Sequence, residues 1–119
     1  IAAFQPGPGM AVYCASKSYV LSLSRAMSSE LKGAGVSVTA LCPGYVQTGF
    51  QEVSGMKLTG VELWSAMRVE RVAKIAVRAM MNRRREVIPG FVNWGVPLLG
   101  RILPIRLQLM IVKTMLMLR

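Results

Sequence analysis

The chain has 119 residues, 53% of them hydrophobic, and its 15 Lys and Arg against 5 Asp and Glu give a net charge of +10. This is the length of one domain or part of one, with the composition of a folded chain. It has no His and no Asp, which excludes a Ser-His-Asp triad and a His-ligated metal site within these residues. Cys14 and Cys42 have no metal-binding or redox spacing, so we expect reduced thiols, as in a cytosolic protein.

The first predicted elements are a loop and a long helix. The run Pro-Gly-Pro-Gly at 6–9 cannot continue a helix, so residues 1–9 are predicted to form a loop. Apolar residues then recur at spacings of three and four from residue 10 to 32. This periodicity predicts one helix, ended by Gly33 and Gly35.

Two residues near the start of this helix have complementary chemistry. Tyr13 and Lys17 are four residues apart, a spacing that puts both side chains on one helical face. An ammonium held beside a phenol favours the phenolate and lowers a phenol's pKa. Such a phenol can exchange a proton with a carbonyl or an alcohol. Pairs at this spacing are more often ordinary surface neighbours.

The next predicted element is a short buried strand at 36–42, where β-branched residues alternate and Pro43-Gly44 ends the run. In a doubly wound α/β sheet, ligands bind at the carboxyl ends of the strands. Residues 43–48 are therefore expected to contact a cofactor, although Pro-Gly also marks ordinary turns.

A long connector, a second helix and a second strand follow. Residues 50–67 are predicted to be irregular, as either a lid or a surface loop. Residues 68–85 show a helical stripe, and 86–90 read as a strand at the edge of the sheet, beside the strand at 36–42.

In this order, the sequences YCASK at 13–17 and PGYVQT at 43–48 resemble the two motifs of the short-chain dehydrogenase/reductase family, Tyr-x-Ala-Ser-Lys and Pro-Gly-x-Val-x-Thr. The resemblance runs from residue 1 to about residue 90. It implies the C-terminal half of the family domain: an α/β fold, part of a Rossmann-like doubly wound parallel sheet, with two strands and two or three helices. The Gly-rich cofactor turn and the catalytic serine would lie before residue 1. We therefore expect the isolated chain to be inactive and to bind dinucleotides weakly.

The resemblance also implies roles for individual residues. Tyr13 would be the general acid and base, and Lys17 would favour its phenolate and bond the ribose hydroxyls. The Val46 backbone and the Thr48 hydroxyl would hold the nicotinamide carboxamide of NAD or NADP, and Tyr45 would touch substrate. The cofactor-binding set is Tyr13, Lys17, Pro43, Gly44, Val46 and Thr48; no metal site is predicted.

Partners follow from the same resemblance. The helix at 10–32 would pack against a second subunit, which predicts a homo-oligomer. The connector at 50–67 would close over an apolar carbonyl or alcohol substrate. The residues expected to line that apolar pocket are Phe50, Met56, Leu58, Leu63 and Trp64.

Residues 91–119 are predicted to be a basic, apolar helical extension of the domain at 1–90. On one continuous helix, Arg101, Arg106, Lys113 and Arg119 fall within a sector about 140° wide. They interrupt every apolar run before the ~18 residues of a membrane span. The extension would either lie on a membrane surface or cover the substrate pocket or a partner subunit.

The basic excess has two further interpretations. A nucleic-acid site would need aromatic residues interleaved with the cations or a groove-reading element, which the sequence lacks, so no nucleic-acid partner is expected. The second functional hypothesis is a catalytically inactive membrane-surface or scaffold protein of the same fold, bound through the tail. The expected location is the cytoplasm, with peripheral membrane contact through 91–119 left open.

Overall fold

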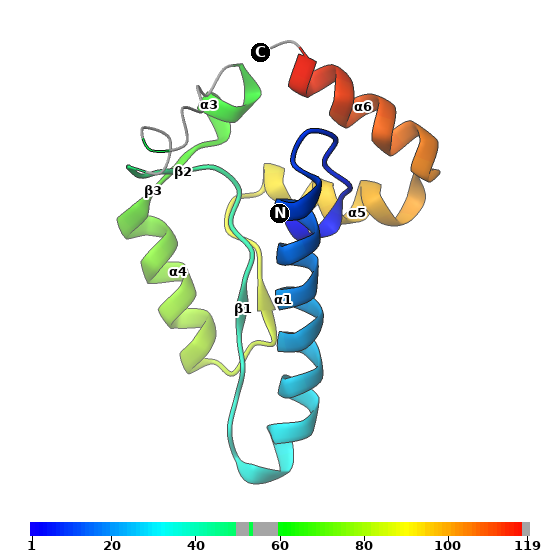
Figure 1. Cartoon of the computed structure of the whole chain (residues 1–119). Helices are drawn as coiled ribbons and strands as arrows, with labels where there is room; N and C mark the ends of the chain where they lie inside the picture. Colours follow the sequence, from blue (N-terminus) through cyan, green and yellow to red (C-terminus); the bar gives the residue numbers. More distant parts are fainter. Residues whose placement is uncertain (50–52, 54–59, 118–119) are drawn as a thin grey trace.

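The computed structural model shows helices on both sides of short parallel strands (Figure 1). It describes residues 1–49, 53 and 60–117. Strand β1 (Ala40–Leu41) pairs in parallel with β4 (Glu86–Val87). Helix α1 (Ala11–Glu30) contacts β1, and helix α4 (Val69–Met81) contacts β4 from the other side. This parallel pairing between flanking helices agrees with the expected α/β class and with the place of β4 beside β1.

The strand content differs from the prediction. A second parallel pair, β2 (Val46–Gln47) with β3 (Met67–Arg68), was not expected. The predicted strand at 36–42 shrinks to Ala40–Leu41, with hydrogen bonds from Ala40 N to Arg85 O and from Cys42 N to Val87 O, both 2.9 Å. Pairing starts late because β4 begins only after the turn at 82–85, which leaves Val36 51% exposed.

Helix α1 confirms the predicted long helix. A turn closed by Met10 N to Gly7 O at 2.8 Å leads into it. It passes into a 3₁₀ turn at Leu31–Ala34, and Gly35 then takes φ 73°. This left-handed conformation is easiest for glycine, so Gly35 ends the helix as its position in the sequence predicts.

The second helix is shorter than the predicted 68–85. Asn82 Nδ2 bonds to the carbonyl of Arg78 at 2.8 Å, and Arg83 has φ 52°, so α4 ends at Met81. Part of the connector at 50–67 is regular rather than irregular, because α3 (Val61–Ser65) precedes β3.

The C-terminal extension forms two helices rather than one. Helix α5 (Gly95–Ile102) ends before Leu103, which has φ −78° and ψ 137°, and α6 (Ile105–Met117) follows. Pro104 explains the break, because proline excludes helical geometry from the residue before it. Among the helices of the described residues, none has the length and apolar character needed to cross a membrane.

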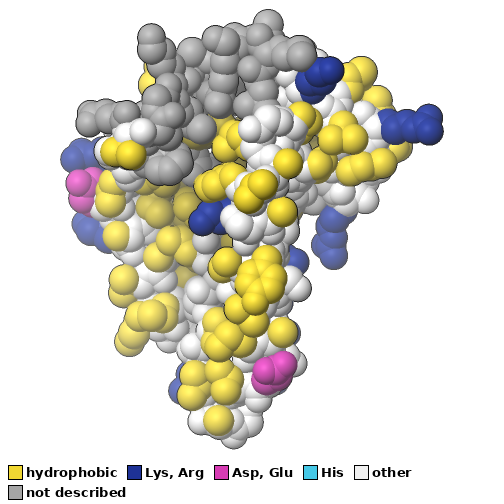
Figure 2. Space-filling model, in the orientation of Figure 1, with side chains coloured by type: hydrophobic (Ala, Val, Ile, Leu, Met, Phe, Trp, Pro, Cys, Tyr) yellow, Lys and Arg dark blue, Asp and Glu magenta, His cyan; other side chains and the backbone are white. Residues whose placement is uncertain are grey.

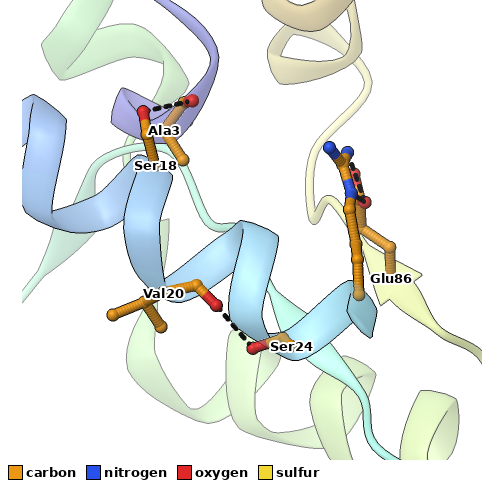
Figure 3. Close-up of polar contacts among 6 residues, drawn as sticks. Ala3, Ser18, Val20, Ser24 and Glu86 are labelled. Carbon is orange, nitrogen blue, oxygen red and sulfur yellow. Dashed lines mark hydrogen bonds and ion pairs between the residues drawn. The ribbon is translucent and has the colours of Figure 1, made fainter. Parts of the chain in front are cut away.

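Polar contacts tie the first residues and β4 to α1 (Figure 3). Ser18 Oγ donates to the carbonyl of Ala3 at 2.8 Å, which holds the 3₁₀ turn Ala2–Phe4 on α1. Arg25 reaches Glu86 Oε2 of β4 at 2.7 Å. Helix α5 packs on the same turn, where a Cβ at Gly100 would lie 2.7 Å from the Phe4 carbonyl oxygen.

The hydrophobic core is small. One cluster consists of Leu21, Ala40 and Cys42, with Phe4 and Ile88 packed against it. Other buried apolar side chains include Cys14, Val72 and Ala79. The accessible surface is 8608 Å², against about 6,300 Å² for a compact monomer of this mass. Much apolar side-chain surface of the helices therefore remains uncovered, as the yellow side chains in Figure 2 show.

Candidate active site

A cavity of about 570 Å³ lies where the first turns of α1 meet the segment that follows β1. The residues that the sequence analysis assigned to catalysis, to cofactor binding and, with Tyr45, to substrate contact beside the cofactor turn all line it: Tyr13, Lys17, Pro43, Gly44, Tyr45, Val46 and Thr48. The structure thus brings two segments together that are about thirty residues apart in the sequence. Their roles stay predictions, but their convergence on one cavity is observed.

Tyr13 and Lys17 lie together in the first two turns of α1. The Lys17 Nζ is 5.3 Å from the centroid of the Tyr13 ring, within the range of a cation–π contact. Tyr13 is 40% exposed, so its phenol is accessible from the cavity. The hydroxyl of Ser16 donates to the Tyr13 carbonyl at 2.7 Å, a bond within the helix that leaves Ser16 a structural residue here.

The backbone of segment 43–48 is held at two points. The Pro43 carbonyl accepts a hydrogen bond from the nitrogen of Ile1 at 2.7 Å. The Tyr45 carbonyl accepts one from Met67 N at 2.9 Å, which begins the β2–β3 pair. Tyr45 and Val46 are half-buried, whereas Thr48 is exposed. The backbone of this segment is therefore fixed while its Thr48 side chain stays accessible.

Asn93 is a site residue that the sequence analysis missed. Its side chain is 4% exposed, and Nδ2 donates to the Pro89 carbonyl at 2.7 Å. A Cβ built on Gly44 would overlap this amide, and one on Gly90 would lie 2.8 Å from Nδ2. Asn93 therefore packs between the two Pro-Gly turns and sets the position of Gly44. The sequence does carry a signal for this residue, because Asn93 is a lone amide in an apolar run, three residues after Gly90.

Val112 of α6 is the second residue missed, and nothing in its apolar surroundings marks it. It lines the cavity beside Tyr13 and Lys17. The predicted apolar lid is not reproduced where it can be seen: Leu63 is 60% and Trp64 76% exposed, and neither lines the cavity. Both lie on the short helix α3, which presents them to solvent. Phe50, Met56 and Leu58 lie outside the described residues.

The two cysteines are neutral parts of the wall. Both are free and buried, in agreement with the expected reduced thiols, and both line the cavity. Burial raises the pKa of the Cys14 thiol. Burial also raises the pKa of the Cys42 thiol, and the negative charge of Glu86 raises this pKa further. Both thiols therefore stay protonated near neutral pH.

Known proteins are similar to parts of this chain. Residues 1–59 match the family model for short chain dehydrogenases. The ketoacyl reductase HetN of Nostoc is 41% identical over 81 residues, which is 65% of this chain and 26% of the relative. The 2-(S)-hydroxypropyl-CoM dehydrogenase 3 of Xanthobacter autotrophicus is 38% identical over 71 residues, 59% of this chain and 26% of the relative.

A third relative, the 17-beta-hydroxysteroid dehydrogenase 13 of Mus musculus, is 28% identical over 90 residues, 72% of this chain and 28% of the relative. No solved structure matches the chain significantly. The chain spans only about a quarter of the length of these curated relatives. Through its family model and these relatives, the chain belongs to the short-chain dehydrogenase/reductase family.

Proposed function

We propose that the protein is an oxidoreductase that transfers a hydride between NAD or NADP and the carbonyl or secondary alcohol carbon of an apolar substrate. The observation that carries this proposal is the shared cavity. Tyr13, Lys17 and segment 43–48 line it together, and this family membership makes dehydrogenase chemistry the expected use of such a site.

The residues present fit a nicotinamide cofactor. The cavity volume of about 570 Å³ lies in the range of roughly 300–1,000 Å³ of small-molecule and cofactor sites. Gly44 lines this cavity, and its missing side chain leaves room for the Asn93 amide that holds the segment in place. Lys17 and Thr48 would hold the ribose and carboxamide, and the bound nicotinamide would supply or accept the hydride.

The chain's own contribution is proton transfer and charge. Tyr13 would donate its phenolic proton to a carbonyl oxygen in reduction and take a proton from an alcohol in oxidation. The Lys17 ammonium, 5.3 Å from the ring centroid, would stabilise the negative charge that develops on the phenolic oxygen. The buried thiols of Cys14 and Cys42 would add no charge there.

An apolar substrate suits the remaining walls. Beside the polar groups, the cavity is lined by the apolar residues Ala3, Met10, Val20, Leu41 and Val112. Two relatives are named for ketoacyl and hydroxysteroid compounds, which combine a carbonyl or alcohol with an apolar body. A polar sugar or amino acid would leave its hydrogen bonds unmet against such walls.

The test compares two tyrosines of one helix in the protein at its full length. Tyr13→Phe is expected to lower kcat at least ~100-fold, with the cofactor Kd nearly unchanged. The matched control is Tyr19→Phe, because Tyr19 is 68% exposed and does not line the cavity. Turnover would be followed as NADH and NADPH consumption with 3-ketoacyl esters and aromatic ketones. A Tyr13→Phe variant that keeps more than a few per cent of the rate would overturn the proposed role.

A further inference from the structure

Helices α5 and α6 and the turn before them carry a set of exposed apolar side chains, which we call the tail surface. Its exposed fractions are Trp94 64%, Leu98 52%, Leu99 53%, Ile102 69%, Ile105 56% and Met110 59%. Large exposed apolar patches on a folded chain mark sites of interaction rather than ordinary surface. We therefore expect the tail surface to bind a partner.

The charge of the same region has one sign. Arg101, Arg106 and Lys113 are exposed, and no Asp or Glu follows Glu86 in the sequence. Figure 2 shows basic side chains projecting among apolar ones in the region that α5 and α6 occupy in Figure 1. The partner should therefore be both apolar and anionic.

The elbow between the helices gives the tail surface a fixed direction. Gln108 Nε2 donates to the carbonyls of Gly100 at 3.0 Å and Leu103 at 2.7 Å, and so satisfies the end of α5. Gln108 and Val112 are one helical turn apart, and they are half-buried, whereas the rest of 105–114 is exposed. Within residues 105–114, α6 thus turns one narrow side, which includes the cavity residue Val112, toward the rest of the molecule and its other sides outward.

Neither of the two helices is long enough to cross a bilayer, so a membrane contact would lie in its interface. Helix α5 has 8 residues and α6 has 13, or about 12 and 20 Å of helix, against a hydrocarbon core of about 30 Å. Short helices with exposed apolar side chains and basic residues bind in the plane of the membrane interface.

We infer that the tail surface docks on a membrane that contains anionic lipids. The apolar side chains would enter the boundary between headgroups and acyl chains, and Arg101, Arg106 and Lys113 would remain at the level of the lipid phosphates. A second copy of the chain fits less well. Residues 68–119 hold 11 Lys and Arg against 2 Glu, so two tail surfaces brought together would repel each other.

The test is sedimentation of the full chain with sucrose-loaded vesicles of phosphatidylcholine, with and without phosphatidylserine. The chain is expected to bind the anionic vesicles and to dissociate as salt rises. The variant Arg101→Gln/Arg106→Gln/Lys113→Gln is expected to bind them roughly 100-fold more weakly at low ionic strength. The variant Ile102→Ser/Met110→Ser tests the apolar part and is expected to weaken binding too.

The matched control is Arg83→Gln/Arg84→Gln/Arg85→Gln. It removes the same charge from exposed residues between α4 and β4, far from α6 in Figure 1, and is expected to leave most binding intact. Equal loss in this control, or undiminished binding in the tail variant, would overturn the inference. The inference would also be overturned if the tail variant changed the oligomeric state in solution, or its binding to duplex DNA, while its binding to vesicles stayed the same. Circular dichroism would confirm that each variant is folded, and none of these readouts requires hydride transfer.

Discussion

The side-chain amide of Asn93 lies against the backbone of Gly44, so closely that a methyl group at position 44 would overlap it. Asn93 also donates to the Pro89 carbonyl. One buried amide therefore links the turn after β1 to the turn after β4. This link explains how a residue outside both family motifs fixes the segment that borders the cavity.

The contact predicts coupled effects on stability. Gly44→Ala is expected to cost about 1–3 kcal/mol because the new methyl displaces the Asn93 amide. Asn93→Ala loses its hydrogen bond at about 1–2 kcal/mol. The double variant should cost clearly less than the sum, because the smaller residue removes the overlap.

Urea unfolding of the four proteins of this cycle measures the coupling. Gly33→Ala is the control, because nothing lies within 4 Å of a Cβ there, and should change the free energy of unfolding by less than about 0.5 kcal/mol. Strictly additive effects of the two site variants would contradict the packing described.

The buried thiols predict a fall in stability at alkaline pH. Burial raises the pKa of Cys14 and Cys42 above the ordinary 9.0, so above that pH the unfolded chain loses these protons first. Their contribution to stability is thus complete below pH 9.0 and is lost as pH rises through the folded-state pKa values.

The measurement is the free energy of unfolding from pH 7 to pH 10 under reducing conditions. Cys14→Ala/Cys42→Ala should be less stable at neutral pH but show a shallower decline. An identical slope in the variant would show that the thiols do not carry the effect. A thiol reagent should also react slowly with the folded chain and rapidly in urea.

The ion pair between α1 and β4 predicts a small, salt-dependent effect. Arg25 donates from Nε at 3.0 Å and from Nη2 at 2.7 Å to Glu86 Oε2. The Arg25 side chain is 53% exposed, so Arg25→Gln should cost about 0–1 kcal/mol, less at high salt. Lys74→Gln, at another exposed position, controls for net charge in the same unfolding series. A loss above about 2 kcal/mol would show that the pair acts as a buried one.

The elbow predicts a local effect on α6. Gln108→Leu removes both hydrogen bonds to the end of α5 and should cost about 1–2 kcal/mol if α6 stays docked. Amide hydrogen exchange should accelerate in α6 while α1 and α4 remain protected. Thr114→Val is the control, since the exposed Thr114 donates its hydroxyl to the Met110 carbonyl one turn back within α6. Unchanged protection of α6 in Gln108→Leu would exclude the elbow as its anchor.

Local spacing predicted the parts of the site that local geometry determines. Tyr13 and Lys17 are one helical turn apart, so their proximity follows from α1 alone. Pro43 and Gly44 end a strand for reasons of backbone chemistry. Homo-oligomerisation through the helix at 10–32 and the cytoplasmic location stay predictions, and the sequence makes no choice between NAD and NADP.

Long-range packing accounts for what the sequence could not supply. The strands of the β2–β3 pair are two residues long, too short to show the alternation of apolar and polar residues that predicts a strand. The burial of Asn93 depends on two turns that are distant in the sequence. The break in the tail is different, because Pro104 is visible in the sequence. The residue before a proline avoids helical geometry, so a single helix across 91–119 was the wrong interpretation of an available signal.

Val112 and Lys113 are adjacent in α6, yet one lines the cavity and the other is exposed with the cations of the tail surface. Val112 and Lys113 belong to one continuous helix, so a displacement of α6 at the tail surface would also move a residue of the cavity wall. A ligand in the cavity that prefers one position of α6 would change the affinity of the tail surface for its partner. By thermodynamic reciprocity, that partner would change the affinity of the cavity for the ligand by the same factor. Turnover in the cavity and attachment through the tail surface would then be coupled through the position of one helix.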